Sequence, residues 1–218
     1  TLVPKFFDET GTTYDGVVSY GTLGKDKYWK RKMLEQISDG SSFLDLACGT
    51  GILTREIAEK FPNSKIVGID ITKSYLDVAK ENSSYFENIS FILDDAEEFK
   101  LDSKFDCITA SYLPKYCDPE ILVKNCTAHL KPGGKIIFHD FTYPKNLVVR
   151  GLWNLFLTSL RLVGCFIPSW KDALIGLPKL IRRTKWLESY SDVMKKNGLK
   201  VNRQYLTCGA SAILTGTK

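Results

Sequence analysis

Short apolar runs alternate with helical patterns from Ser42 to Phe141, and no other feature restricts the fold of this chain as strongly. Apolar residues recur at the helical period in "GILTREIAEKF" (51–61), whereas "SKIVGID" (64–70) is a compact apolar run typical of a buried strand. Repeated alternation of strand and helix predicts a parallel sheet with helices on both faces. Strands are predicted at 42–47, 64–70, 89–96, 105–111 and 131–141.

The C-terminal part of the chain has a different pattern. A helix ending at Gly198 precedes two alternating segments, 199–206 and 209–218, which predict an antiparallel hairpin. The expected fold class is therefore α/β: a doubly wound, Rossmann-like sheet of seven mostly parallel strands, with a C-terminal antiparallel hairpin and a helical insert. We predict four parts: an N-terminal helical cover (1–40), an α/β core that binds the cofactor (41–141), a helical insert that forms a substrate lid (142–186), and a C-terminal helix and hairpin that complete the core (187–218).

Composition narrows the functional classes. The 218 residues are 44% apolar and 25% charged, as in ordinary soluble proteins, and the net charge of +5 permits an anionic partner without requiring one. Six cysteines without a C-x-x-C pair, together with two histidines, predict no metal site and a reducing, cytoplasmic location. We find no dedicated nucleic-acid module in the sequence and expect no nucleic-acid partner.

The turn after the first predicted strand, "LDLACGTGILT" (44–54), places a carboxylate beside two glycines. Ligands of doubly wound sheets bind at the carboxyl ends of the strands, and Gly49 and Gly51 allow the backbone to approach one closely. A dinucleotide-binding turn would carry a third glycine where Thr54 stands. Asp45 would repel a pyrophosphate, but it can face the methionine ammonium of S-adenosylmethionine, directly or through water. The alternative for Asp45 is a structural aspartate that caps the turn.

Acidic residues at the next two strand ends indicate a nucleoside. Asp70 is placed to accept hydrogen bonds from two ribose hydroxyls, which S-adenosylmethionine shares with dinucleotides. Asp95 can accept from an adenine amino group, the Ala96 N–H can reach a ring nitrogen, and Ile71 can pack on the ring. The alternative for Asp94 and Asp95 is a solvated loop. Together with the glycine turn, these residues predict S-adenosylmethionine as the cofactor.

From Phe43 to Phe141 these motifs resemble the class I S-adenosylmethionine-dependent methyltransferases. A narrower resemblance, to the ubiquinone/menaquinone biosynthesis C-methyltransferases, is carried by residues 6–34, by "FTYPKN" (141–146) and by residues 202–218. It implies C-methylation of a lipophilic quinol or phenol such as a demethylmenaquinol, with Tyr14 in a cover over the site. It also implies cofactor contacts from Thr50, Asp70, Asp95, Ala96 and Ser111.

Two segments depart from that family pattern. Where the family carries "SFGLRN", this chain reads "SYLPKY" (111–116), with Lys115 in place of an arginine, and residues 170–186 replace a tyrosine-rich substrate segment. Both departures concern the acceptor, so other acceptors stay open: another small molecule or lipid, or RNA or protein, which the basic cluster at 179–185 suggests. A non-catalytic cofactor-binding protein is a further alternative. The oligomeric state is also open, with a homodimer as one option.

The insert contains a strongly apolar stretch, 147–168, interrupted by Arg150 and Arg161. The uncharged run between the two arginines is too short to span a bilayer. The stretch is predicted to be a helical lid over a lipophilic acceptor, a helix packed on the core, or an interfacial helix in peripheral contact with a membrane. In the lid interpretation, Trp153 and Phe156 help to form the acceptor pocket.

Methylation of a ring carbon needs an electron-rich acceptor, and a general base that removes the proton of a phenolic hydroxyl would supply one. Candidates follow the fifth predicted strand: Asp140, His139 and Tyr143. His139 and Asp140 are adjacent in a strand, so only one of them can face the site. Asp140 is favoured because the family resemblance places an acidic residue there, and the alternative for His139 is a structural role.

Overall fold

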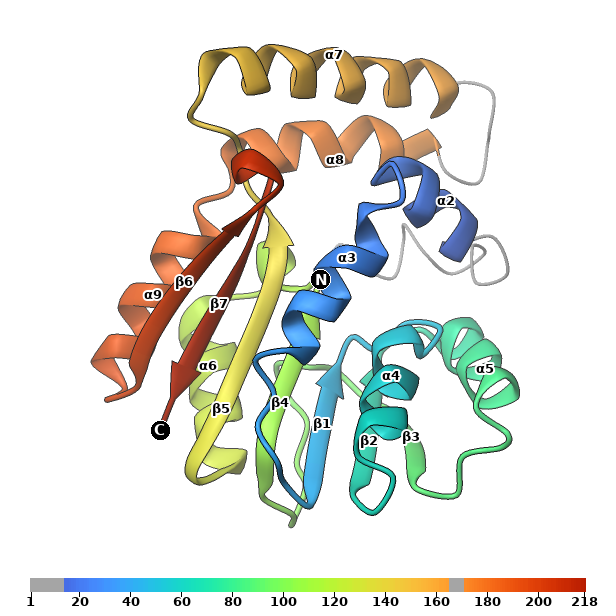
Figure 1. Cartoon of the computed structure of the whole chain (residues 1–218), viewed down its shortest axis with the longest axis vertical. Coiled ribbons are helices and arrows are strands. Elements are labelled where there is room, and N and C mark those ends of the chain that lie inside the picture. The colour runs from blue at the N-terminus through green and yellow to red at the C-terminus, as the bar shows by residue number, and fades with distance from the viewer. Residues whose placement is uncertain (1–13, 165–170) are drawn as a thin grey trace.

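The computed structural model describes residues 14–164 and 171–218, and a seven-stranded sheet runs through its centre (Figure 1). The strand order is β3-β2-β1-β4-β5-β7-β6. The first five strands pair in parallel, and β7 pairs antiparallel with both β5 and β6, which confirms the predicted fold class. The strands are β1 (Ser42–Leu46), β2 (Lys65–Asp70), β3 (Ile89–Leu93), β4 (Phe105–Ser111), β5 (Leu130–Phe141), β6 (Lys200–Leu206) and β7 (Ser211–Thr217).

The direction of strand order reverses at β1, which lies between β2 and β4. Leu44 is opposite Val67 on one side and Ile108 on the other. The chain leaves β1 for β2 on one side and reaches β4 and β5 on the other, so the connections diverge at the carboxyl ends of β1 and β4. Sheets of this kind bind ligands in the crevice at such a switch point.

Helices cover both faces of the sheet, because successive strand residues point to opposite sides. Phe43 packs with Trp29 of α3 (Lys25–Leu34) and Ile57 of α4 (Ile52–Lys60). The next residue, Leu44, belongs to the core on the other face, which includes α6 (Pro119–His129) and α9 (Trp186–Lys196). The other described helices are α2 (Tyr14–Gly21), α5 (Lys73–Asn82), α7 (Leu147–Gly164), α8 (Lys171–Arg183) and the short η1 (Pro114–Tyr116) and η3 (Thr207–Gly209).

The insert forms two helices, α7 and α8, instead of one apolar stretch. They stack above the end of the sheet at which β5 finishes, with α8 between α7 and the rest of the molecule (Figure 1). Leu157 and Leu160 of α7 are buried in the same core cluster as Trp29. The Arg182 guanidinium of α8 donates to Asn154 Oδ1 of α7 at 2.9 and 3.1 Å, which ties the two helices together. Residues 165–170, the end of the predicted apolar stretch among them, lie outside the described part.

Two global properties bear on function. Between residues 14 and 164 and between 171 and 218, no helix is both long and apolar enough to cross a membrane. The same residues contain no cluster of histidine, cysteine and acidic side chains that could hold a metal ion.

One strand boundary differs from expectation. β3 ends at Leu93, so Asp94, Asp95 and Ala96 lie in the loop beyond it, where the Asp94 N–H donates to the Asp70 carbonyl at 3.2 Å.

Candidate active site

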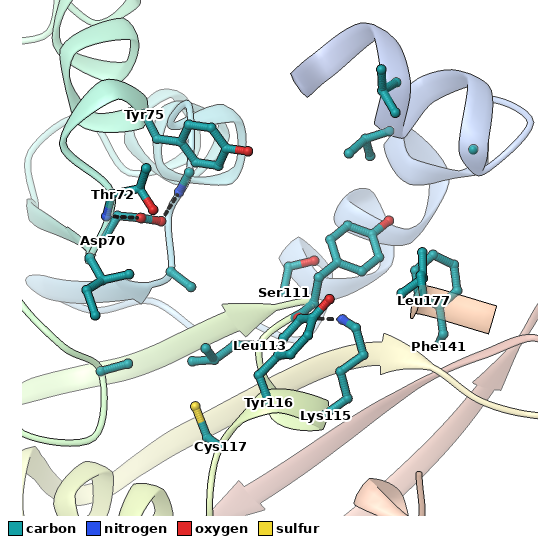
Figure 2. A pocket seen from close by; sticks show the side chains of 18 of the residues that line it. Asp70, Thr72, Tyr75, Ser111, Leu113, Lys115, Tyr116, Cys117, Phe141 and Leu177 are labelled. Atoms are coloured by element: carbon teal, nitrogen blue, oxygen red, sulfur yellow. Dashed lines mark hydrogen bonds between the residues drawn. The ribbon is translucent and has the colours of Figure 1, made fainter. Parts of the chain in front are cut away.

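A large cavity, hereafter the main cavity, opens at the carboxyl ends of β1, β2 and β4 (Figure 2). It combines two kinds of lining. Predicted cofactor residues from the strand ends form one part: Gly49, Asp70, Ile71, Asp95, Ala96 and Ser111. Aromatic and aliphatic side chains form the other: Tyr112, Tyr116, Phe141, Leu160, Leu174 and Leu177. Val17 and Val18 of α2 also line it, so the N-terminal helix borders the same space.

Asp70 organises the polar part of the main cavity. One carboxylate oxygen accepts from the Gly49 N–H and the other from the Thr72 N–H, both at 2.8 Å. Burial raises the pKa of Asp70, and these two hydrogen bonds oppose that rise. The Thr72 hydroxyl and the Ile71 N–H also act on this carboxylate. Asp70 lines the main cavity, so its oxygens border the space in which a ligand would lie.

The glycine turn needs its glycines for different reasons. Gly49 lines the main cavity with a positive φ of 57°, and Ala47 before it has a φ of 50°. Gly51, in contrast, supports the turn from behind. Its φ is 79°, and a Cβ there would lie 3.1–3.3 Å from Arg55, Ala79 and the Phe91 ring. The described lining of the main cavity does not include Gly51, and the close neighbours of that Cβ position favour a packing role.

Asp45 has protein partners at both carboxylate oxygens. The Thr54 hydroxyl donates to one oxygen at 2.7 Å and the Thr109 hydroxyl to the other at 2.8 Å. The side chain is 2% exposed, and burial raises its pKa to about 6 despite these hydrogen bonds. Asp45 is outside the described lining of the main cavity. These contacts favour the structural alternative, in which Asp45 fixes the turn between β1 and α4.

Thr50 also points to the protein. It is 2% exposed, and its hydroxyl donates to Asp15 Oδ1 of α2 at 2.6 Å. Thr50 therefore links the glycine turn to the N-terminal helix, and the described cavity lining does not include it. Tyr14 is the first residue of α2, but its side chain lies outside the described part of the structure, as do residues 6–13 of the N-terminal segment.

His139 is enclosed between two serine hydroxyls, as its structural alternative describes. Its Nδ1 lies 3.0 Å from Ser111 Oγ and its Nε2 lies 2.6 Å from Ser211 Oγ, and the residue is 0% exposed. Burial is the main cause that holds the pKa of His139 well below its usual value, with the charges of Lys30 and Lys115 adding to it. A neutral ring with both nitrogens engaged, away from the described cavity lining, can orient Ser111 but cannot reach an acceptor.

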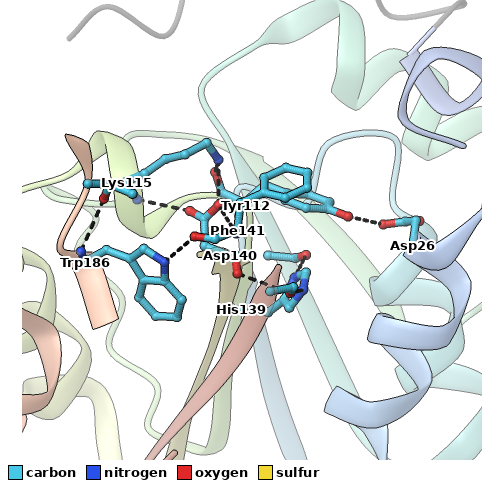
Figure 3. Close-up of polar contacts among 10 residues, drawn as sticks. Asp26, Tyr112, Lys115, His139, Asp140, Phe141 and Trp186 are labelled. Carbon is cyan, nitrogen blue, oxygen red and sulfur yellow. Dashed lines mark hydrogen bonds and ion pairs between the residues drawn. The ribbon is translucent and has the colours of Figure 1, made fainter. Parts of the chain in front are cut away.

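Lys115 and Asp140 form a buried ion pair at the wall of the main cavity (Figure 3). Lys115 Nζ donates to Asp140 Oδ1 at 2.9 Å and to the Tyr112 carbonyl at 2.5 Å, while Asp140 Oδ2 accepts from the Lys115 N–H at 3.1 Å. Burial lowers the pKa of Lys115 and raises that of Asp140, and the ion pair opposes both shifts. Lys115 lines the main cavity, whereas Asp140 lies behind it and reaches that space through Lys115.

Three aromatic rings surround the Lys115 amine. Nζ lies 4.4 Å from the ring centroid of Tyr116, 5.5 Å from that of Tyr112 and 5.8 Å from that of Phe141. Aromatic faces attract a cation, so they offset part of the cost of its burial. The prediction from sequence missed this cage. The sequence feature that could have indicated the cage is the "SYLPKY" segment, which holds its two tyrosines and Lys115. In the structure, Tyr112 has a positive φ of 64° directly after β4.

The Tyr112 hydroxyl connects the cage to α3. It donates to Asp26 Oδ1 at 2.8 Å, and Asp26 also forms a short ion pair with Lys30. Asp26 and Lys30 are both buried, at 6% and 7% exposure. Tyr112 is thereby fixed by a polar network on one side and stacked on Phe141 on the other, with ring centroids 5.1 Å apart.

Tyr143 lies in a different place from the one predicted. Its hydroxyl is bonded to the Asn154 side chain of α7 at 2.9 Å, and it lines a second groove together with Trp186 and Cys208. The described lining of the main cavity does not include it. The chain turns away from the strand ends after Phe141, so the tyrosine two residues later belongs to the base of the insert. This position places the Tyr143 hydroxyl against α7, apart from the other two predicted bases.

The family described as "Methyltransferase domain" matches residues 37–160, which is more than half of the chain. The chain therefore belongs to this family, and it is a class I S-adenosylmethionine-dependent methyltransferase. It is similar over 226 residues to the ubiquinone/menaquinone biosynthesis C-methyltransferase UbiE of Hahella chejuensis, at 29% identity, with 99% of this chain and 91% of that protein covered. The demethylmenaquinone methyltransferase of Chlorobaculum tepidum is 28% identical over 91% of this chain and 84% of its own length.

A solved structure supports the same fold. The plantazolicin methyltransferase BpumL, in complex with a monoazolic desmethylPZN analog and SAH, superposes with a TM-score of 0.67 over 95% of this chain and 88% of that chain, at 14% identity. S-adenosylmethionine is the cofactor of this chain. The residues present fit it, because Asp70, an acid at the end of β2, lines the cavity together with Gly49 of the glycine turn.

Proposed function

We propose that this protein transfers a methyl group to a ring carbon of a lipophilic quinol or phenol of the demethylmenaquinol type. The observation that carries the proposal is the position of Lys115, an amine in the otherwise aromatic and aliphatic part of the main cavity. An apolar ring fits that surrounding, and its hydroxyl would meet the amine. The names of the two relatives, which act in quinone biosynthesis, support the same acceptor class.

The cofactor contacts are part of this proposal. Asp70 would accept from the ribose hydroxyls, Asp95 from the adenine amino group, and Ile71 would pack on the adenine. The Ala96 N–H, the Gly49 backbone and the Ser111 hydroxyl complete the polar part of the cavity. When bound, the cofactor supplies an electrophilic methyl group on a sulfonium. Ser111 lies at the border between the two parts of the cavity and is held by His139, so it is placed near the reacting groups.

Lys115 would activate the acceptor. Burial lowers the pKa of Lys115, which favours release of its proton, while the ion pair with Asp140 opposes that shift. The neutral amine accepts the phenolic proton, and the ammonium then stabilises the phenolate whose ring carbon bonds to the methyl. That carbon afterwards loses its own proton and Lys115 returns a proton to the oxygen, so one proton is released per methyl group transferred. Asp140 acts as a positioning residue that holds Lys115.

The two helical segments around the cavity would act as covers. Val17 and Val18 of α2 and Leu160, Leu174 and Leu177 of the insert present apolar side chains to the same space. Excluding water and aligning the acceptor with the methyl group are the main contributions of such covers, because alignment alone can lower a barrier by roughly 7–11 kcal/mol in well-oriented systems. A lipophilic acceptor resides in a bilayer, so we include peripheral contact of a cytoplasmic enzyme with a membrane in the proposal.

The test is an acceptor series. Purified protein is incubated with methyl-labelled S-adenosylmethionine and reduced demethylmenaquinone analogues that share the ring and differ in the length of the side chain. The proposal expects transfer to the ring carbon, identified by mass spectrometry, with a KM that falls as the side chain lengthens. Transfer to an oxygen, or none to any analogue while a cell extract contains a labelled RNA or protein, would contradict it.

A further inference from the structure

The outer surface of α7 is apolar although it faces away from the protein. Four aliphatic residues, here called the outer stripe, are 64–72% exposed: Val148, Leu152, Leu155 and Leu162. They are spaced four, three and seven residues apart, so they share one side of the helix. Leu157 and Leu160, which are 1% and 4% exposed, take a different side and pack on the core. The helix is thus apolar on two sides: one is buried against the core, and the other, the outer stripe, is exposed.

Basic residues occupy a side of α7 that lies away from the outer stripe. Arg150, Asn154 and Arg161 lie along another side of α7, at spacings of four and seven residues. The Arg182 guanidinium of α8 is bonded to Asn154, which brings the basic residues of α8 to that side. Lys179, Arg182 and Arg183 are all exposed and share one side of α8. The insert thus carries an apolar ridge on one side of α7, and a cationic flank formed by another side of α7 and the exposed side of α8.

The charge of the chain is concentrated in this insert. Residues 142–186 contain eight of the 30 basic residues and one of the 25 acidic residues, so the insert carries a formal charge of +7 and the rest of the chain −2. A solvated helix pair would need neither this excess of one sign nor the exposed leucines. An apolar ridge together with a cationic flank complements the surface of an anionic bilayer, which offers acyl chains below negatively charged headgroups.

We propose that the α7–α8 pair docks the enzyme on an anionic lipid surface, with the outer stripe inserted between headgroups and the basic flank on phosphates. This orientation of the insert agrees with the proposed function. The inference rests on the proposed function for the reason to dock, whereas its evidence is the surface of the insert. Leu160, Leu174 and Leu177 of the same two helices line the main cavity. A docked insert therefore lies between the bilayer and that cavity, and a lipophilic acceptor would pass from one to the other without crossing water.

Vesicle flotation tests the docking in the absence of acceptor and cofactor. The probes are vesicles of phosphatidylcholine alone and of equal parts phosphatidylcholine and phosphatidylglycerol. We expect the wild type to float with the anionic vesicles and to be released by high salt, which screens charges over a few ångströms. The variant Leu152→Ser/Leu155→Ser should lose binding at least tenfold, since two inserted leucines no longer gain from burial. Arg182→Gln/Arg183→Gln should lose roughly fivefold per charge.

The control variant Ile121→Ser/Tyr85→Ser removes exposed apolar side chains elsewhere, at 51% and 95% exposure, and should bind like the wild type. Failure of the wild type to bind anionic vesicles, or equal binding by the leucine variant, would overturn the inference. A third outcome would also overturn it: the wild type sediments as a dimer, the leucine variant sediments as a monomer, and neither protein binds vesicles. A second copy of the chain would then cover the outer stripe.

The two proposals fail separately. Vesicle binding without methylation of any quinol would leave the docking surface in place and remove the acceptor. Methylation of a short-chain, water-soluble quinol at equal rates by the wild type and the leucine variant, with no vesicle binding by either, would leave the acceptor in place and remove the docking surface.

Discussion

Lys115 Nζ lies 2.9 Å from Asp140 Oδ1, and the two side chains are 2% and 0% exposed. Such a pair gains little stability overall, because the cost of removing both charges from water offsets their attraction, but breaking it by removing one partner is expensive. Its position beside the aromatic cage suggests that it is retained for chemistry.

The first prediction concerns this pair. Lys115→Met removes the amine while keeping an apolar side chain of similar length, and should lower kcat/KM for the quinol at least a hundredfold, which corresponds to about 2.7 kcal/mol of transition-state stabilisation. The affinity for S-adenosylmethionine, measured by calorimetry, should change less than twofold. Because Asp140 would be left unpaired, Lys115→Met/Asp140→Asn is the matched variant that restores folding. Substantial quinol methylation by that double variant would refute the role of the amine.

The second prediction concerns the cofactor. Asp70→Ala removes the acceptor of two backbone N–H groups and of the expected ribose hydroxyls. Losing hydrogen bonds to a charged group costs about 1.5–3 kcal/mol each, so the Kd for S-adenosylmethionine should rise a hundredfold or more. The control is Asp77→Ala, an exposed acid paired with Lys73 on α5, which should bind normally. Near-normal calorimetric affinity of Asp70→Ala would exclude Asp70 from the site.

The third prediction concerns the pH dependence of stability. Burial raises the pKa of Asp45 from 3.8 to about 6, so the folded state binds this proton more tightly than the unfolded state does. The contribution of Asp45 to the free energy of unfolding therefore increases as pH falls from 6 to 4, by about 2 kcal/mol. Asp45→Asn should remove that slope, as measured by urea unfolding of both proteins between pH 4 and pH 8. Parallel curves for the two proteins would contradict the burial of an ionisable Asp45.

The fourth prediction separates the lid from the core. Leu174→Ser/Leu177→Ser removes apolar cavity lining and should raise the acceptor KM about thirtyfold with the cofactor Kd unchanged, since each leucine loses roughly 1 kcal/mol of contact. Trp153→Ser should instead lower the free energy of unfolding by about 2 kcal/mol, because Trp153 packs on Phe141 and Phe156. Equal effects of both variants on KM would mean that the insert has no separate lining surface.

Much of the fold followed from local pattern. The alternation of apolar runs and helical periods predicted the strands of the parallel part, because each strand between helices is a short apolar run. The insert was less predictable. Its apolar residues serve both the core and the outer stripe, so one apolar stretch did not reveal where α7 ends and α8 begins.

The candidate site was predicted where it depends on strand ends, and missed where it depends on contacts between distant segments. Asp70, Asp95 and Ser111 follow strands that meet at one edge of the sheet, and all three line the main cavity. The partners of Asp45 are Thr54 and Thr109, and the latter comes from a strand 64 residues away that sequence spacing does not bring near. The enclosure of His139 between two serines depends on β7 in the same way.

The most direct measurement is the distribution of a labelled methyl group among the classes of acceptor molecule. Methyl-labelled S-adenosylmethionine, the purified protein and a reduced membrane extract are incubated, and the lipid, nucleic acid, protein and small polar fractions are separated and counted. The account predicts that label collects in the lipid fraction, in a quinol methylated on ring carbon, and that Lys115→Met/Asp140→Asn abolishes it. Label confined to RNA, protein or polar metabolites would contradict the proposed acceptor.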